Sequence, residues 1–524
     1  MLVLPVKCWL KTFMPHTPSK AVTLFDTLDC ARVESLCTTD TPLAFSDASR
    51  GAIEASHVAL RELADRGEPI YGLTTGFGPF VKFASANDGD ASHGAGLIAH
   101  LGAGFGAPAP RAVVRAAMLL RCQTLSQGFS GASPAVSDAM LALYNSGLCP
   151  VVPELGSVGA SGDLIPLSHV AAVLSGHGSV LDDSGSVVPG LPELRRARLT
   201  PLPLVSRDAL SLVNGTSFMT AFAAIAVARA ERLLDLAERL TGWAYRQLGC
   251  RAQALDHRLH QARGHAGQVE SAANILAEAE LYGSWEIPDR PLQEIYSLRC
   301  APQMLGACRD LLNFARATVD HEINGVNDNP LVLTDTPTVL HGGNFQGQQI
   351  AFASDALNAC LVQIGVLVER QVDAINNPAI NGGAPLLLAW QPGADSGLAG
   401  AQLTATSLVA EMRHHALPSA NSSIPTNGGN QDVVSMGTTA ARAAFGQTER
   451  LPGILAVLGI SLAQLNFLRQ HNRCAGPLTP TPAWFPDYQP FTHDRALYTD
   501  IQRIARCLLE PAGAAPSSRH SVAA

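Results

Sequence analysis

Three long apolar segments with helical spacing constrain this chain more than any other feature of its sequence. Residues 218–248 run almost without Gly or Pro, and their apolar side chains recur at spacings of three or four. Residues 354–375 repeat the pattern until an Asn-Asn-Pro run at 376–378 ends it. Residues 438–470 form a third such segment, in which Pro452 is expected to kink or break the helix. Helices of this length and apolarity bury several faces, so we predict a helical bundle that is shared between subunits.

Composition narrows the class of protein. Charged residues make up only 15% of the 524 residues and apolar residues 47%, so we expect the chain to bury surface against further copies of itself. The net charge of −8 gives no support to nucleic-acid binding. No apolar run is long enough to span a membrane, and residues 1–16 lack the features of a signal peptide. Eleven scattered cysteines without a C-x-x-C pair fit reduced thiols in a cytoplasmic protein.

The chain divides into four predicted parts: an N-terminal extension over 1–45, an N-terminal domain over 46–213, the helical bundle over 214–510 and a flexible tail over 511–524. Within the N-terminal domain, helices are predicted at 47–66, 111–127 and 134–146, and short strands only within 178–206. Residues 71–96 are too rich in Gly for a regular element, so we predict a long mobile lid loop there.

A stretch rich in Gly and Ser at 156–169 contains three small residues in a row, Ala160, Ser161 and Gly162, followed by Asp163. Its composition alone is that of a turn, with Asp163 starting a helix. The same residues also permit the chain to react with itself. If the Gly162 nitrogen attacks the Ala160 carbonyl and water is lost, an imidazolone ring forms. Loss of a second water from Ser161 leaves an exocyclic methylidene, which is a strong electrophile.

Other polar positions are ambiguous when each is taken alone. Tyr71 lies on the Gly-rich loop, where it is either a surface tyrosine or a group that reaches a substrate. Tyr296 and Arg299 share one helical face, and the arginine is suited either to holding a carboxylate or to an ordinary ion pair. Three Asn-rich loops, at 327–330, 342–345 and 427–432, are each consistent with turns or helix caps.

Two patterns that suggest a cofactor are rejected. The Gly-rich segment at 102–106 lacks the preceding strand and the glycine spacing of a dinucleotide-binding fingerprint. His257, His260 and His265 lie in a polar helical stretch with Arg neighbours, and we interpret them as part of a solvated helix face. We therefore predict no metal site.

Taken together, the motifs resemble those of the aromatic amino acid ammonia-lyases and aminomutases, which carry a 4-methylidene-imidazol-5-one (MIO) group. The resemblance covers about residues 45–475 and rests on these motifs: Tyr71-Gly-Leu-Thr-Thr-Gly-Phe-Gly, Gly156-Ser-Val-Gly-Ala-Ser-Gly-Asp-Leu, Val213-Asn-Gly-Thr, Tyr296-Ser-Leu-Arg-Cys-Ala-Pro-Gln, Asn327-Asp-Asn-Pro-Leu and Asn430-Gln-Asp. It implies a mainly α ammonia-lyase (fumarase/aspartase-like) fold, with a central bundle and a smaller MIO-containing N-terminal domain. It also implies a homotetramer with shared active sites and a small amino-acid substrate. No external cofactor is needed, because the MIO forms autocatalytically from Ala160-Ser161-Gly162.

Carried over by position, the resemblance assigns catalytic roles to Tyr71, Ala160, Ser161, Gly162, Asn214 and Tyr296. It assigns substrate contacts to Gly78, His100, Leu101, Leu164, Arg299, Asn329, Phe345, Asn427, Asn430 and Gln431. Tyr71 matches the loop base that removes the β-proton, and Arg299 and Asn329 match the residues that hold the carboxylate. A tyrosine acts as a base only if its surroundings lower its pKa, which we expect in a closed site near helix N-termini.

His100, Leu101 and Gln431 bear on the substrate. The His-Leu pair resembles that of bacterial tyrosine-selective members, in which the imidazole hydrogen-bonds the phenol, whereas phenylalanine-selective members have Phe-Leu. Histidine-selective members have Glu where this chain has Gln431, and Asn427 also fits the tyrosine pattern. The first hypothesis is therefore a tyrosine ammonia-lyase that forms p-coumarate.

The alternatives are a tyrosine 2,3-aminomutase, a phenylalanine or histidine ammonia-lyase, and a helical scaffold that has kept the fold without the reaction. The retained Ala160-Ser161-Gly162 triplet argues against a scaffold. The family's usual Leu-Gln ahead of the His100-Leu101 pair is absent, since this chain reads His93-Gly94-Ala95-Gly96-Leu97, and this bears on the choice between lyase and mutase. Small residues at 397–400 replace bulkier ones and bear on the pocket volume.

Overall fold

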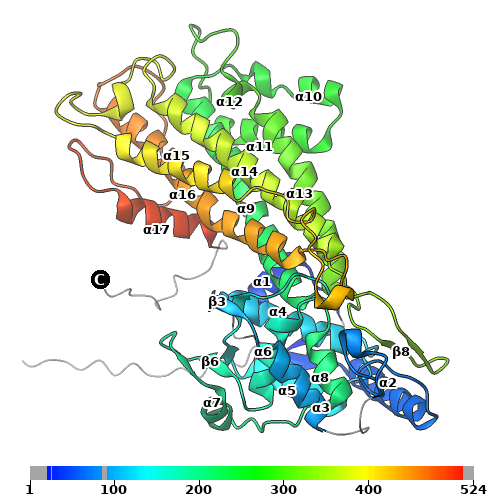
Figure 1. The fold of residues 1–524 in the computed structure, drawn as a ribbon. Helices are drawn as coiled ribbons and strands as arrows, with labels where there is room; N and C mark the ends of the chain where they lie inside the picture. The colour runs from blue at the N-terminus through cyan, green and yellow to red at the C-terminus, as the bar shows by residue number, and fades with distance from the viewer. Residues whose placement is uncertain (1–20, 25, 40, 85–90, 511–524) are drawn as a thin grey trace, which may run out of the picture.

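The computed structural model describes residues 21–24, 26–39, 41–84 and 91–510. A bundle of long helices extends from a smaller region of shorter helices, and the whole is elongated (Figure 1). The bundle is formed by α9 (Ser217–Leu248), α11 (Ala266–Glu280), α13 (Ala301–Asn324), α14 (Gln348–Asn376) and α16 (Gly437–Gln470). The predicted mainly α-helical class is confirmed.

The helix α9 is the central element of the bundle. It packs against α16, α11, α13 and α14, and it also contacts α4 (Arg111–Ser126) of the smaller region. Almost all of its residues are buried, which explains why its sequence is apolar on several faces. It ends at Gly249, whose φ of 68° lies in the left-handed region that terminates helices and that only glycine adopts freely.

Of the two effects expected of Pro452 on the third long segment, a break is wrong. The helix α16 continues through Pro452 as one element of 34 residues. Pro452 and its neighbours on both sides are buried, and α16 packs against both α14 and α9 along its length. A proline removes one backbone hydrogen bond, and burial of the surrounding apolar turns outweighs that local cost.

The smaller region contains α2 (Asp47–Asp65), α3 (Ala91–Leu101), α4, α5 (Pro134–Asn145), α6 (Leu164–Leu174), α7 (Gly190–Arg196) and α8 (Ser206–Val213). The helices predicted at 47–66, 111–127 and 134–146 are confirmed within two residues at each end. Contacts of α3 and α6 with α8 place all three against one another. This packing fixes two walls of the cavity described below.

The loop predicted over 71–96 is shorter than expected, because α3 already begins at Ala91. The glycine that suggested a loop has a packing role. A Cβ atom at Gly94 would lie 2.0 Å from the carbonyl oxygen of Leu204, so glycine lets α3 approach that segment closely. Leu97 and Ile98 are buried on the same side. Residues 85–90 of the predicted lid lie outside the described residues.

Strands are short and are not confined to 178–206, which corrects the prediction. The parallel pair β1 (Val22–Leu24) and β2 (Leu43–Phe45) lies near the start of the chain. Antiparallel pairs join β3 (Phe105–Pro108) to β5 (Pro153–Leu155), β4 (Cys149–Pro150) to β6 (Ser179–Leu181), β6 to β7 (Val187–Pro189) and β8 (Leu331–Leu333) to β9 (Thr338–Leu340). Ladders of two to four residues are too short to produce a readable alternation in sequence.

The remaining helices are α1 (Cys30–Thr38), α10 (His257–Arg263), α12 (Tyr296–Arg299), α15 (Ala399–His414) and α17 (Tyr498–Leu509). Near the two ends of the described chain, α1 packs on α9 and α4, and α17 packs on α16 and α9. The flexible tail predicted at 511–524 lies outside the described residues, as do residues 1–16, on which the signal-peptide prediction rests.

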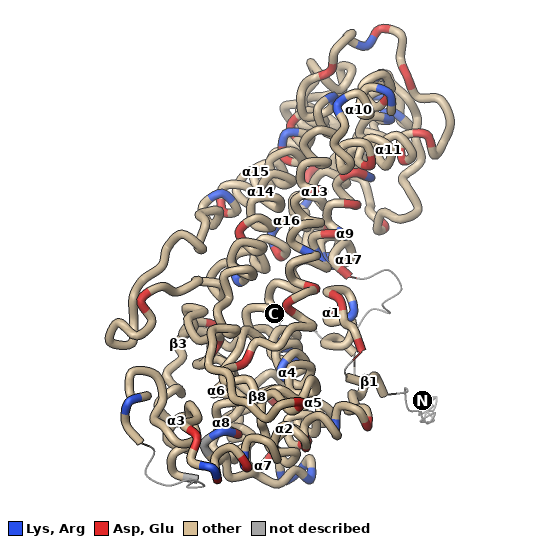
Figure 2. The backbone as a smooth tube through the Cα atoms, turned by 90° about the vertical axis from the view of Figure 1, so that its right-hand side faces the viewer, with Lys and Arg blue, Asp and Glu red and all other residues tan. Residues whose placement is uncertain are grey.

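Two helices, α14 and α16, are long and apolar enough to cross a membrane by length and composition alone. Both are core helices of the bundle, and most of their apolar windows are buried against other helices. Charged residues gather at the end of the bundle around α10 and α11 and are sparse along its middle (Figure 2). Burial within the bundle therefore accounts for the apolar character of both helices.

Candidate active site

The Ala160-Ser161-Gly162 loop is pressed against the chain segment that precedes α9. Gly162 pairs with Gly215 as an isolated parallel bridge, and the Asp163 amide donates to the Gly215 carbonyl at 2.7 Å. A Cβ atom on Gly162 would lie 2.0 Å from that carbonyl oxygen, and the φ of Gly162 is +68°. Position 162 therefore requires glycine for steric reasons as well as for the chemistry inferred above.

Asp163 anchors this loop through a different helix from the one predicted. Its backbone occupies the N-cap position of α6, but its side chain makes no capping bond there. Instead, its carboxylate accepts from the Met219 amide in the first turn of α9 at 2.7 Å and from the Thr438 hydroxyl in α16 at 2.6 Å. The N-termini of α6, α9 and α16 thus meet behind the loop. Burial raises the pKa of Asp163 to about 6, although these hydrogen bonds oppose the shift.

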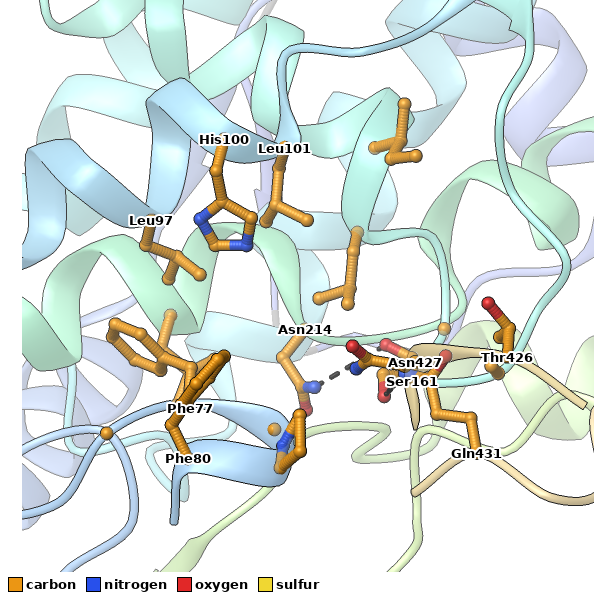
Figure 3. Close-up of a pocket in the computed structure, with 18 of the residues that line it drawn as sticks. Phe77, Phe80, Leu97, His100, Leu101, Ser161, Asn214, Thr426, Asn427 and Gln431 are labelled. Atoms are coloured by element: carbon orange, nitrogen blue, oxygen red, sulfur yellow. Dashed lines mark hydrogen bonds between the residues drawn. The ribbon is translucent and has the colours of Figure 1, made fainter. Parts of the chain in front are cut away.

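Two amide side chains contact Ser161 from the cavity side (Figure 3). Gln431 Nε2 donates to Ser161 Oγ at 2.9 Å, and Asn214 Nδ2 lies 3.4 Å from the Ser161 carbonyl oxygen. The Asn214 carbonyl in turn accepts from the fully buried Arg121 guanidinium at 2.5 Å. Ser161, Asn214 and Gln431, which lie far apart in the sequence, are therefore brought together as the sequence predicted.

A cavity of about 820 Å³ opens over the loop. Eleven predicted site residues line it: Tyr71, Gly78, His100, Leu101, Ala160, Ser161, Gly162, Leu164, Asn214, Asn427 and Gln431. Its volume is in the range of small-molecule sites and exceeds what one amino acid fills, and polar and apolar side chains share the lining. Within the described part of the chain, Tyr296, Arg299, Asn329, Phe345 and Asn430 are predicted site residues that do not line it.

His100 lies on the wall of the cavity opposite Ser161 (Figure 3). Its Nδ1 lies 3.0 Å from the Gly96 carbonyl oxygen one turn earlier in α3, so Nδ1 carries the proton. This tautomer leaves Nε2 as an acceptor. Leu97 and Leu101 flank the ring on the same helix. A ligand that reaches this wall meets one hydrogen-bond acceptor beside Leu97 and Leu101, on a histidine that is exposed in the single chain.

Tyr71 borders the cavity, and its phenol oxygen accepts a hydrogen bond from the Gly78 amide at 2.8 Å. The expectation that its surroundings lower its pKa is wrong for this chain by itself. Burial raises the pKa of Tyr71, and the Gly78 amide and the positive charge of Arg207 only oppose that rise.

Sequence reasoning missed several residues that line the cavity, chiefly Phe77 and His93. Their rings stack at 4.4 Å between centroids, and Phe77 also meets Tyr71 edge to face at 6.3 Å. His93 was visible in the sequence as a departure from the family pattern. Its contact with Phe77 required the structure, because 16 positions of chain separate the two and α3 carries only one of them.

Tyr296 and Arg299 are remote from the loop within one chain. They lie on α12 at the end of the bundle farthest from α6 (Figure 1). The Arg299 guanidinium lies 4.7 Å from the centre of the Tyr296 ring, and Tyr296 is 68% exposed. The phenol of Tyr296 is therefore at the surface of the bundle, whereas Arg299 beside it is half-buried.

Three further predicted site residues also lie outside the cavity lining: Asn329, Phe345 and Asn430. The Asn329 side-chain oxygen accepts from the Gly342 amide at 2.7 Å, so it holds a neighbouring loop. Phe345 is half-buried in the segment before α14, and Asn430 is exposed beside Gln431.

The interpretation of His257, His260 and His265 as a solvated face is wrong for His260. His260 is fully buried, donates to the Ala254 carbonyl at 3.1 Å and accepts from Gln268 at 2.9 Å. Burial lowers its pKa. In the part of the chain that the structure describes, no group of three His, Cys, Asp or Glu residues is placed to hold a metal ion.

A family model described as "Aromatic amino acid lyase" matches residues 28–482. The chain belongs to this family. Among curated aromatic amino acid lyases, it is 41% identical to a histidine ammonia-lyase from Gloeobacter violaceus, with 84% of each chain covered. It is 37% identical to a tyrosine ammonia-lyase from Cereibacter sphaeroides, with 94% of this chain and 98% of that one covered.

The same family contains its structural neighbours. A tyrosine aminomutase from Streptomyces globisporus superposes with a TM-score of 0.86 at 33% identity, covering 94% of this chain and 97% of that chain. The aromatic amino acid lyase family thus accounts for the fold and for a carbon–nitrogen lyase activity. Because histidine and tyrosine enzymes are similarly close, overall similarity leaves the substrate open.

Proposed function

We propose that this lyase removes ammonia from L-tyrosine to give p-coumarate, using an MIO formed from Ala160-Ser161-Gly162 without an external cofactor. The observation that carries the proposal is the placement of Ser161 under Gln431 and Asn214, opposite an imidazole at His100. The triplet fits the ring, because Gly162 has no room for a side chain and Ala160 is buried beside it.

The residues around the cavity then have distinct tasks. When formed, the ring supplies an electrophilic carbon that takes up the substrate amine and makes it a good leaving group. Tyr71 accepts the β-proton at its phenol oxygen; burial raises its pKa in one chain, and the Gly78 amide and Arg207 oppose that rise. Asn214 orients the ring by its contact with the Ser161 carbonyl oxygen, and Gln431 holds Ser161 Oγ until that oxygen leaves as water. Leu101 and Leu164 contact the apolar face of the substrate ring.

Two positions support tyrosine as the substrate. The free Nε2 of His100 accepts a phenol hydrogen, and a phenylalanine ring leaves that acceptor without a partner. Gln431 is neutral where a histidine-selective site would offer a carboxylate to an imidazole. Tyrosine 2,3-aminomutase is a second candidate, supported by the similarity to the Streptomyces globisporus enzyme.

The remaining predicted contacts are supplied by other subunits in a homotetramer. Arg299 and Asn329 hold the substrate carboxylate, and Tyr296, Phe345 and Asn430 complete the site. This proposal rests on the distance between α12 and the loop within one chain and on large apolar side chains exposed on the bundle. The latter include Leu292, Ile295, Leu311, Phe314, Phe352 and Leu403. We further propose a cytoplasmic location, with residues 46–213 and 214–510 as the two domains.

The deciding experiment is separate incubation of the enzyme with L-tyrosine, L-phenylalanine and L-histidine, with products identified by chromatography and mass. We expect p-coumarate from tyrosine, a smaller yield of cinnamate from phenylalanine and no product from histidine. β-Tyrosine among the products identifies an aminomutase, and urocanate identifies a histidine lyase. Ser161→Ala should remove nearly all turnover, whereas Ser175→Ala, at the other end of α6, should leave it unchanged. Turnover near the wild-type level in Ser161→Ala would rule out the MIO mechanism.

A further inference from the structure

The main chain of Tyr71 is held by a histidine that the sequence did not single out. The Tyr71 amide donates to Nε2 of His341 at 3.1 Å, across 270 positions of sequence. An acceptor at Nε2 fixes the neutral tautomer with the proton on Nδ1. His341 directly follows the hairpin of β8 and β9, so the hairpin reaches the segment that carries the phenol.

A small apolar cluster holds the same hairpin beside the Tyr71 segment. Ile70 and Leu73, on either side of Tyr71, are buried together with Val332 of β8 and with residues of α2. This cluster is separate from the main core. The hairpin thus packs on the neighbours of Tyr71, and its last contact is the hydrogen bond from His341.

The loop that carries His341 is fixed from behind. The Gly342 amide donates to the Asn329 side-chain oxygen at 2.7 Å. Asn329 itself is held through its carbonyl by the buried Arg207, which also pairs with Asp328 at 2.9 Å. A continuous series of contacts therefore runs from Arg207 in α8 through Asn329 and the 341–342 loop to the Tyr71 amide.

We propose that His341 is a positioning residue for Tyr71 and that protonation of His341 releases the Tyr71 segment. The proposal rests on the proposed role of Tyr71 as the base. A protonated imidazole has two donors and no acceptor, so it cannot keep the bond to the Tyr71 amide. Burial and the positive charge of Arg207 lower the pKa of His341, which keeps the ring neutral near neutral pH. Among the residues that the structure describes, Arg207, which pairs with Asp328, is the charged group that acts on His341.

The test compares His341→Gln, which keeps an acceptor that does not titrate, with His341→Leu, which has none. Values of kcat and KM are measured across pH 5–9 beside wild type and His177→Gln, an exposed histidine outside the cavity. We expect His341→Leu to lower kcat about tenfold with KM unchanged, as for one lost hydrogen bond. His341→Gln should restore kcat at neutral pH. Its kcat should also fall less than that of wild type as the pH is lowered, because glutamine does not take up a proton. Asp163, whose pKa is raised to about 6, contributes to the pH dependence of every variant. The readout is therefore the difference between the pH profiles of the variants and that of wild type.

Two outcomes overturn the proposal: wild-type kcat in His341→Leu, or a pH profile of His341→Gln that superposes on wild type. If His341→Leu fails to fold, the profile of His341→Gln decides alone. Failure of the proposed function is recognised separately in wild type: a different product from the three amino acids changes the substrate or reaction but leaves the His341 test in place, and a protein without the mass loss of two waters has no MIO and no turnover to measure. In that case hydrogen exchange of the backbone amides in peptides covering 70–77 still tests the hydrogen bond between His341 and the Tyr71 amide. We expect faster exchange in His341→Leu than in wild type, and equal exchange would contradict the proposal.

Discussion

Gly162 and Gly215 are in such close contact that a single methyl group on Gly162 would collide with the Gly215 carbonyl, 2.0 Å away. Gly162→Ala should therefore displace the loop from α9 and prevent ring closure. Intact-protein mass spectrometry measures this directly, because the ring forms with loss of two waters. Gly67→Ala is the matched control, since Gly67 also has a left-handed φ, +80°, but has nothing within reach of an added Cβ. A dehydrated Gly162→Ala protein would contradict the steric argument.

His100→Phe should shift the preference from tyrosine toward phenylalanine. The substitution removes the Nε2 acceptor and leaves the phenol hydroxyl without a partner in an apolar setting, at a cost of about 1–3 kcal/mol. The ratio of kcat/KM for the two substrates is therefore expected to fall by about tenfold or more. His177→Phe, outside the cavity, should leave the ratio as it is. An unchanged ratio in His100→Phe removes the specificity argument.

Ser161→Ala and Arg299→Ala should each be inactive alone and active when co-expressed. In a shared site, the loop of one chain meets the α12 of another, so random mixing gives about a quarter of the sites both intact residues. Ammonia release by the purified mixed oligomer, relative to wild type, is the measurement. A mixture without activity would show that both residues act within one chain or that mixed oligomers do not form, and differently tagged chains distinguish these cases.

Asp163→Asn should change how stability depends on pH. The pKa of Asp163 is raised to about 6 in the folded protein, so the native state binds its proton more tightly than the unfolded chain. This contribution is present below about pH 4 and is lost as the pH rises through 6. The stability of wild type relative to Asp163→Asn should thus fall by about 3 kcal/mol between pH 4 and pH 7.

Denaturant titrations at matched pH measure this difference. Asp182→Asn is the control of opposite sign, because hydrogen bonds from Ser184 and Ser186 lower the pKa of the exposed Asp182. Relative to that variant, wild type gains stability as the pH rises. A wild-type advantage over Asp163→Asn that stays constant with pH would mean that burial does not raise the pKa of Asp163.

The elements that the sequence predicted well are those whose apolar spacing persists over several turns. The pattern at 218–248 located α9 almost to the residue, because every turn of that helix is buried. Pro452 was misjudged, since its local cost is visible in sequence and the packing of α14 and α9 around it is not. Gly94 was misjudged for a related reason: glycine marks both loops and close helix packing, and only the position of Leu204 separates them.

In the candidate site too, local sequence identified the reactive residues but not their distant contacts. The sequence singled out Ser161 and Gly162 because they can form a ring, and both line the cavity. Gln431, from a distant segment, donates a hydrogen bond to Ser161. The partner of Asp163 was not predictable, because an acid before an apolar run signals a cap on its own helix and its actual acceptor contacts are to α9 and α16. His341 gave no signal at all, since its contact with Tyr71 depends on how the hairpin folds back.

Gln431, Asn214, Gly215 and Asp163 of the same chain all contact the Ala160-Ser161-Gly162 loop or anchor it. Folding of one chain therefore brings these four residues to the ring-forming triplet, whereas the proposed capture of the substrate carboxylate draws on a neighbouring chain. Under that proposal the electrophile is built on contacts made by folding, and the substrate is held by contacts made by assembly. Dilution that separates the subunits would then abolish turnover without dismantling the ring.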